Sequence, residues 1–178
     1  MSFRWLPNTL TLLRCGLAFV VGWQILQLAG ALASTYWPFV LFVGVAATDF
    51  VDGFAARALN AVSSFGAFLD PIADKLLVAI ALLALCHITS WPWWLVLPTA
   101  VIVARDIYVT LIRLRPSVSL PVTRLAKWKT AAEMMGIGGY LLTYGVDIAG
   151  LRLLSLALIG LAAVMSAYTG WLYVRAAR

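Results

Sequence analysis

Six long apolar windows follow one another along this chain, with short segments containing polar or basic residues between most of them. They cover residues 10–28, 36–56, 71–88, 93–112, 130–144 and 151–174. A helix needs about 20 mainly apolar residues to cross a bilayer. Only 11% of the residues are charged, whereas a soluble domain carries roughly 25%, so a soluble helical protein would lack the polar residues to cover its surface. The sequence therefore predicts an all-α, polytopic membrane protein with six transmembrane helices in one bundle, as a single domain over residues 1–178.

The basic residues are distributed unevenly between the segments that join these windows. They gather at both chain ends and in the connectors after the second and fourth windows, whereas the other three turns hold only Arg152. Cytoplasmic connectors of membrane proteins carry the excess of Lys and Arg. Both termini and the two basic connectors are therefore expected in the cytoplasm. The net charge of +6 follows the window ends, not one solvated face, so membrane lipid is an expected partner and nucleic acid is not.

The cysteines and the single histidine show no pattern of metal ligands. Cys15 and Cys86 lie inside apolar windows, where they are expected to pack as small apolar side chains. His87 stands close to several tryptophans at the end of a window, which is typical of an interfacial aromatic belt. Three glycines interrupt the fifth window and favour close contact with a neighbouring helix: Gly136, Gly138 and Gly139.

Four of the seven acidic residues gather in one stretch of the chain: Asp49, Asp52, Asp70 and Asp74. The first two are three positions apart, so they share one face of a helix. The last two are four positions apart on the next helix, which is expected to begin near Leu69 with its proline in the first turn. The connector between these helices is short, so the helices should be antiparallel neighbours. The four carboxylates are therefore expected to face one another near the cytoplasmic surface.

Carboxylates are costly inside a membrane and therefore indicate function. Arg57 and Lys75 are the nearest cations in the sequence, and they are too few to balance four negative charges. Clustered carboxylates are ligands that Mg²⁺ and Mn²⁺ prefer, and paired ions can hold both the attacking and the leaving oxygen of a phosphoryl transfer. The stretch predicts two Mg²⁺ or Mn²⁺ ions per site. A membrane cation transporter, or buried ion pairs that only fix helix register, are the alternatives.

Small residues surround the aspartates. Gly53, Ala56 and Gly66 leave room for a bulky ligand beside the carboxylates. Arg57 presents a planar fork of donors that suits a diphosphate better than a lysine would. The stretch thus predicts a site for a phosphorylated ligand as well as for metal.

The full string reads Asp49-x2-Asp52-Gly53-x2-Ala56-Arg57-x8-Gly66-x3-Asp70-x3-Asp74. Every fixed position and every spacing resembles the signature of the CDP-alcohol phosphatidyltransferases. The similarity extends over nearly the whole chain, through residues 7–14, 65–75, 104–107 with Arg113, and 127–130. Residues 65–75 are most similar to the branch of the family that makes phosphatidylglycerophosphate. The resemblance implies a six-helix bundle, usually a homodimer, with its site at the cytoplasmic face.

The resemblance also implies roles for individual residues. Asp49, Asp52, Asp70 and Asp74 would hold the two metal ions, and Asp74 would be the catalytic base that takes the proton from the acceptor hydroxyl. Six residues would contact the CDP moiety: Asn8, Thr48, Gly53, Ala56, Arg57 and Gly66. The implied reaction is direct attack of that hydroxyl on the phosphorus of CDP-diacylglycerol that bears the diacylglycerol, with CMP leaving.

Glycerol-3-phosphate is the acceptor that the resemblance favours. Its phosphate needs a basic pocket, for which Arg105, Arg113, Lys127 and Lys129 are the candidates. Alternatively, these residues only set the topology, or Arg105 is neutralised by Asp106. Cardiolipin synthases of the same family carry a similar Arg-Asp pair, so phosphatidylglycerol is the alternative acceptor, with inositol phosphate and serine as further options. A compact chain of this kind fits a bacterial inner membrane.

Overall fold

The computed structural model describes residues 5–30, 35–58, 64–113 and 124–176; within these ranges, the side chains of residues 5–11, 49–58, 64–71, 74, 113, 124 and 176 lie outside the described set. The described residues form six α-helices and contain no strand. The helices are α1 (Trp5–Gln27), α2 (Trp37–Ala58), α3 (Ser64–Ile88), α4 (Trp93–Arg113), α5 (Arg124–Leu142) and α6 (Leu151–Ala176), with a short 3-10 turn, η1 (Leu28–Gly30), after α1. The predicted all-α architecture is confirmed.

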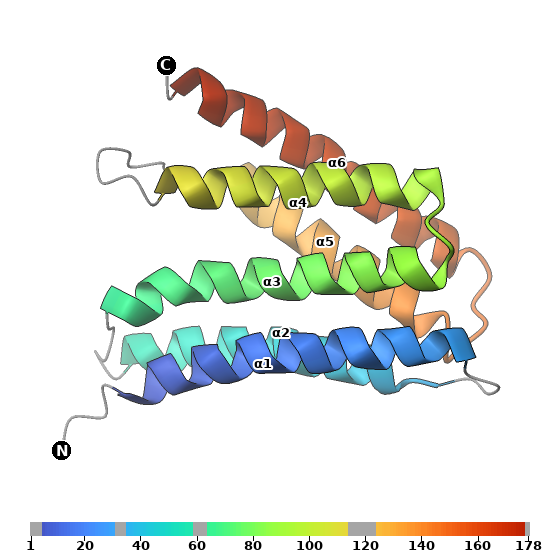
Figure 1. Ribbon diagram of the computed structural model, residues 1–178, viewed down its shortest axis with the longest axis horizontal. Helices are drawn as coiled ribbons and strands as arrows, with labels where there is room; N and C mark the ends of the chain where they lie inside the picture. Colours follow the sequence, from blue (N-terminus) through green and yellow to red (C-terminus); the bar gives the residue numbers. More distant parts are fainter. Residues whose placement is uncertain (1–4, 31–34, 59–63, 114–123, 177–178) are drawn as a thin grey trace.

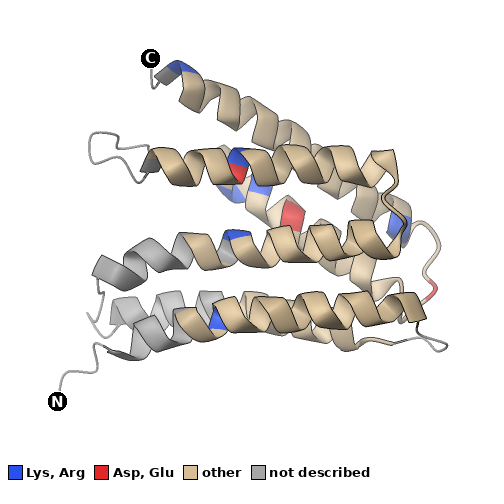
Figure 2. Cartoon of the chain, in the orientation of Figure 1, with Lys and Arg blue, Asp and Glu red and all other residues tan. Residues whose placement is uncertain are grey.

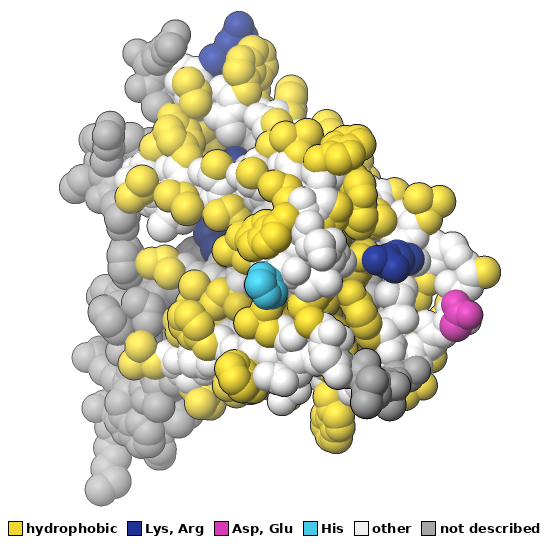
Figure 3. Space-filling view, turned by 45° about the vertical axis from the view of Figure 1, so that its right-hand side comes forward, with side chains coloured by type: hydrophobic (Ala, Val, Ile, Leu, Met, Phe, Trp, Pro, Cys, Tyr) yellow, Lys and Arg dark blue, Asp and Glu magenta, His cyan; other side chains and the backbone are white. Residues whose placement is uncertain are grey.

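Successive helices run in opposite directions along one bundle (Figure 1). α1 packs along α3 and α2, α4 packs against α3 and α6, and α5 packs along α6 and α2. The centre is apolar, and Ile25, Leu82, Leu85 and Tyr140 are fully buried there. Apolar side chains also cover much of the outer surface, where Figure 3 shows few charged groups. A soluble monomer rarely exposes so much contiguous apolar surface, whereas an integral membrane protein does.

Three helices contain stretches long and apolar enough to cross a membrane within the described residues: Leu12–Gly30, Trp93–Ile112 and Leu151–Arg175. α2 and α3 contribute shorter apolar stretches, Trp37–Thr48 and Lys75–Ile88. α5 carries two buried charged side chains, Lys129 and Glu133, in its first half. An integral membrane protein is therefore supported, while the number of crossings stays a prediction.

The glycines of α5 lie where neighbouring helices approach most closely. A Cβ atom on Gly136 would meet the Ile159 side chain at 2.8 Å and the Ile159 backbone nitrogen at 3.1 Å, both on α6. Gly138 faces the Phe42 ring of α2 instead. The prediction of close helix contact is confirmed at Gly136, where a side chain would push α5 away from α6, whereas a Cβ at Gly138 would lie at an ordinary contact distance of 3.8 Å.

One predicted helix start was wrong. α3 begins at Ser64 and not near Leu69, so Pro71 lies inside the helix and not in its first turn. α5 begins at Arg124, ahead of the apolar window that starts at residue 130. In both places the helix continues past the apolar window, because hydropathy marks where the chain leaves lipid and not where its hydrogen-bonded backbone ends.

The cysteines pack as predicted. Both are free; Cys86 is buried, with its Sγ 3.5 Å from the Thr99 hydroxyl, and Cys15 is partly buried. His87 is exposed and meets the Trp91 ring edge to face at 6.2 Å. Its place in an interfacial aromatic belt stays a prediction.

Candidate active site

The four aspartates of the sequence motif belong to two helices whose relevant ends lie at the same end of the bundle. Asp49 and Asp52 are in the last three turns of α2, and Asp70 and Asp74 are in the first three turns of α3. α2 ends and α3 begins at the end of the bundle where α1 also begins (Figure 1). The backbone thus places all four positions at one end, although the described residues of α2 and α3 pack along α1 more than along each other. Their side chains lie outside the described residues, so the expected meeting of the carboxylates stays a prediction.

The residues expected to contact CDP belong to the same end. Asn8 is in the first turns of α1, Gly53, Ala56 and Arg57 are in the last turns of α2, and Gly66 is in the first turn of α3. Of the side chains in this group, only that of Thr48 is described. Its hydroxyl donates a hydrogen bond to the Val45 carbonyl at 2.6 Å. Because the hydroxyl donates in this bond, the Thr48 oxygen can still accept a hydrogen bond from a ligand.

A layer of charged residues crosses the bundle on the inner side of these segments (Figure 2). It includes Arg14 on α1, Lys75 on α3 and a group on α4 and α5. Arg14 is only 2% exposed, although the sequence pattern assigned it to the family's N-terminal segment and to topology. Its position inside an apolar window was the sequence signal for this burial, because a charged residue within such a window normally faces the interior of the bundle.

Four charged residues of α4 and α5 form a connected buried cluster. The Asp106 carboxylate accepts hydrogen bonds through Oδ1 from Arg105 at 2.8 Å and from the Lys129 Nζ at 2.7 Å. Lys129 also lies 3.1 Å from Glu133, one turn further along α5. Two cations and two carboxylates give the cluster no net formal charge. This balance lets four ionisable side chains remain buried in a membrane protein.

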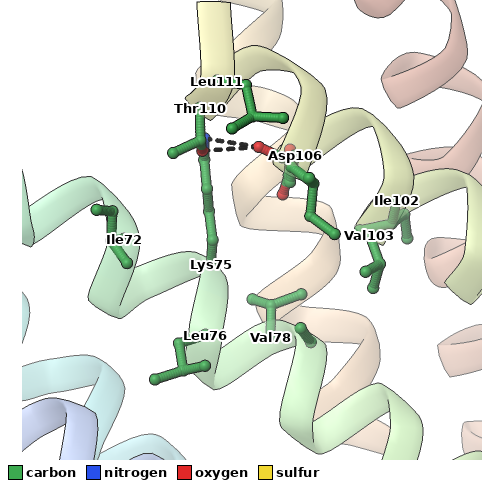
Figure 4. Close-up of a pocket in the computed structure, with 11 residues that line it drawn as sticks. Ile72, Lys75, Leu76, Val78, Ile102, Val103, Asp106, Thr110 and Leu111 are labelled. Atoms are coloured by element: carbon green, nitrogen blue, oxygen red, sulfur yellow. Dashed lines mark hydrogen bonds between the residues drawn. The ribbon is translucent and has the colours of Figure 1, made fainter. Parts of the chain in front are cut away.

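Lys75 connects this cluster to α3, the helix that carries Asp70 and Asp74. Its Nζ donates to the Thr110 hydroxyl at 2.5 Å and to the Asp106 backbone carbonyl at 3.2 Å (Figure 4). These residues line the polar part of a cavity of about 300 Å³ between α3 and α4. The remainder of the cavity is lined by apolar side chains, including Leu76 and Ile107. The cavity therefore offers a charged group at one place and an apolar wall elsewhere.

The candidate acceptor-phosphate residues occupy different environments. Arg105 and Lys129 lie together, each bonded to Asp106. Arg105 is thus paired with Asp106, as one alternative expected. Lys127 is exposed, and Arg113 ends α4 with its side chain outside the described set. Sequence reasoning missed the part played by Glu133, although a carboxylate four positions after Lys129 was a signal for it.

Fold and site together define an α-helical integral membrane protein with its charged residues concentrated toward one end of the bundle. Residues 4–172 match the CDP-alcohol phosphatidyltransferase family. The match covers most of the chain, so the chain belongs to that family.

Three relatives carry the name CDP-diacylglycerol–glycerol-3-phosphate 3-phosphatidyltransferase. The protein of Cereibacter sphaeroides is 41% identical over 145 residues, which are 80% of this chain and 65% of that protein. The protein of Escherichia coli is 37% identical over 184 residues, which are 97% of this chain and 94% of that protein. A Shigella flexneri protein is 36% identical over 182 residues, with the same shares of the two chains.

Proposed function

We propose that this protein transfers the phosphatidyl group of CDP-diacylglycerol to glycerol-3-phosphate, giving phosphatidylglycerophosphate and CMP. The observation that carries the proposal is the complete aspartate string. Its first half belongs to the end of α2 and its second half to the start of α3, at the same end of the bundle. Family membership and the names of the relatives support a transferase that acts in phospholipid biosynthesis.

We further propose that Asp49, Asp52, Asp70 and Asp74 hold two Mg²⁺ or Mn²⁺ ions. The donor set fits, because four carboxylates supply hard oxygen ligands and carry too much negative charge to remain together without cations. Bound ions would neutralise the charge of the diphosphate and of the leaving CMP. Arg57 is in the last turn of α2, where its forked donors would add to the binding of the diphosphate.

The proposed base is Asp74. Its carboxylate would accept the proton of the acceptor hydroxyl while the hydroxyl oxygen forms a bond to the phosphorus that bears diacylglycerol. The bond from that phosphorus to the oxygen of CMP breaks, and CMP leaves with its electron pair. Gly53, Ala56 and Gly66 would leave space for the nucleotide, with Asn8 and Thr48 at its border.

The acceptor phosphate would be bound from the α4 and α5 side. Arg105 and Lys129 are already bonded to Asp106, but a guanidinium has five N–H donors and an ammonium has three. Each cation therefore keeps donors beyond those that Asp106 occupies. Arg113 and Lys127 would add positive charge near the same end. This arrangement suits the phosphate of glycerol-3-phosphate, which bears more charge than the phosphodiester of phosphatidylglycerol.

We also propose six membrane crossings, with both termini and the site in the cytoplasm of a bacterial cell, and a homodimer. α1 begins and α6 ends at the same end of the bundle (Figure 1), as an even number of crossings requires. Arg57, Arg113 and Arg124 belong to helix turns at this end, which agrees with the positive-inside rule.

The function is tested by measuring CMP release from CDP-diacylglycerol by the purified protein, with Mg²⁺ or Mn²⁺ and with chelator as the control. Glycerol-3-phosphate, phosphatidylglycerol, inositol phosphate and serine are compared as acceptors. Metal-dependent release that requires glycerol-3-phosphate supports the proposal. Release with phosphatidylglycerol alone would reassign the protein as a cardiolipin synthase. If folded protein shows no metal-dependent release of CMP with any of these acceptors, the proposed chemistry is contradicted and the cation transporter becomes the better hypothesis.

A further inference from the structure

Asp106 is the point at which three helices are joined by polar contacts. Its carboxylate binds Arg105 on its own helix and Lys129 on α5, and its backbone carbonyl accepts hydrogen bonds from Lys75 on α3 and from the Thr110 hydroxyl. The residue is only 7% exposed. A carboxylate buried this far is retained only where its partners compensate the cost of removing it from water.

Both cations on Asp106 are held in defined positions. Lys129 is 3% exposed and is gripped between Asp106 and Glu133. The guanidinium of Arg105 lies over the Tyr173 ring of α6, 5.4 Å from its centroid. Gly170 leaves the room for this arrangement, because a Cβ there would approach the Cγ of Arg105 to 3.2 Å. The cluster therefore has little freedom to rearrange.

Polar atoms around the cluster have unused bonding capacity. Within the described part of the chain, the Arg105 Nε and the Tyr173 hydroxyl are buried and have no hydrogen-bond partner. The Ser166 hydroxyl, one turn of α6 before Gly170, is also buried and has no hydrogen-bond partner among the described residues. Buried polar groups normally have a partner. The Arg105 Nε is therefore a donor of the cluster that no described residue uses.

We propose that Asp106 is a positioning residue for the acceptor: it fixes Arg105 and Lys129 in the places where they meet the acceptor phosphate and ties them, through Lys75, to the helix that carries Asp74. The inference rests on the proposed function. It differs from the view that the cluster only locks the helices together. Under that view, loss of Asp106 lowers stability and leaves the kinetic constants of the folded enzyme unchanged.

The test is a kinetic comparison of Asp106→Asn, Asp106→Glu and the wild-type enzyme in detergent, with rates referred to folded protein. We expect Asp106→Asn to raise the KM for glycerol-3-phosphate at least about tenfold, since a misplacement of about 1 Å costs on the order of 100-fold in rate. The KM for CDP-diacylglycerol should change less than threefold. Asp106→Glu keeps the charge and both cation partners, so it should restore the KM for glycerol-3-phosphate to within about threefold.

A matched control and a double-mutant cycle separate positioning from general charge loss. Asp147→Asn removes a carboxylate from the exposed turn between α5 and α6 and should change neither KM. In the cycle with Lys129→Met, the effects of the two substitutions on the KM for glycerol-3-phosphate should be less than multiplicative, because Asp106 acts partly through Lys129. Multiplicative effects would overturn the proposal.

Instability of Asp106→Asn does not prevent the test. The double variant Asp106→Asn with Lys129→Met removes one charge of each sign and keeps the cluster neutral, so it is compared with Lys129→Met alone. Because Asp106 also fixes Arg105, the KM for glycerol-3-phosphate should rise further in the double variant, and a KM equal to that of Lys129→Met overturns the proposal. If the wild-type protein releases CMP with glycerol-3-phosphate but Asp106→Asn leaves the KM unchanged, only the proposed role of Asp106 is refuted. Wild-type protein without such release refutes the proposed function and this role with it.

Discussion

The Nζ of Lys75 lies 2.5 Å from the hydroxyl oxygen of Thr110, and this contact joins α3 to α4 directly after the motif residue Asp74. The Thr110 hydroxyl in turn donates to the Asp106 carbonyl at 2.7 Å. Residues of α4 therefore hold the turn of α3 that carries the proposed base. No sequence pattern predicts this contact between the two helices.

Thr110→Val should slow the enzyme, because valine keeps the shape of threonine but cannot accept the Lys75 hydrogen bond. A bond to a charged group contributes about 1.5–3 kcal/mol, and partial compensation by the Asp106 carbonyl should limit the loss of kcat to roughly 3- to 10-fold. The measurement is steady-state CMP release. Thr143→Val is the matched control, since Thr143 lies in the turn after α5 and its hydroxyl donates to the Tyr140 carbonyl at that far end of the helix. Equal effects of the two substitutions on kcat would show that the hydrogen bond from Lys75 does not contribute to turnover.

Gly136→Ala should destabilise the bundle at the contact between α5 and α6. The added methyl group would meet a side chain and two backbone atoms of α6 at 3.1 Å or less, and backbone atoms cannot move aside as a flexible side chain can. Overpacking of this kind costs about 1–3 kcal/mol. Thermal unfolding in detergent should show the loss. Gly160→Ala is the control, because a Cβ at Gly160 meets nothing within 4 Å; a stability as low as that of Gly136→Ala would argue against tight packing as the cause.

The helices could be predicted from the sequence because a membrane imposes length and composition together. Apolar windows found all six helices, and their charge alternation gave the relative directions that Figure 1 shows. The ends of α3 and α5 could not be predicted in the same way. The residues from Arg124 to Lys129 are polar enough to leave the bilayer but remain helical, and hydropathy does not distinguish the two states.

The site was predictable only where its chemistry is encoded in short spacings. The aspartate string lies on two adjacent helices, so positions three and four apart were enough to place it at one end. The contact that joins the two halves of the Asp106 cluster, from Lys129 to Asp106, spans 23 positions, and nothing local shows that Lys129 points into the bundle. Lys127, two positions earlier, is exposed, so two lysines of the same short motif have opposite environments that only the packing of α5 decides.

Arg113→Ala should weaken glycerol-3-phosphate and leave CDP-diacylglycerol unaffected, if Arg113 serves the acceptor and not only topology. Loss of one charge-assisted bond predicts a KM for glycerol-3-phosphate raised by about 10-fold or more. Arg175→Ala is the matched control at the same end of the bundle, where Arg175 is exposed and stacks on Trp171 at 4.0 Å. Similar changes in both variants, or equal changes for both substrates, would assign Arg113 to topology alone.

Asp74→Asn should remove nearly all turnover while the protein remains folded and still binds metal. The amide keeps the size of the carboxylate but cannot take the proton of the acceptor hydroxyl, and loss of a general base lowers rates by about 100- to 10,000-fold. CMP release is measured under saturating substrates, with Mn²⁺ binding followed by electron paramagnetic resonance on the same preparation. Retained Mn²⁺ with lost turnover separates the base from a purely metal-holding role, in which both would fall together. Asp147→Asn, in the exposed turn at the opposite end, controls for loss of a carboxylate as such and should keep full activity. CMP release near the wild-type rate from Asp74→Asn would exclude Asp74 as the base and leave the three other aspartates as candidates.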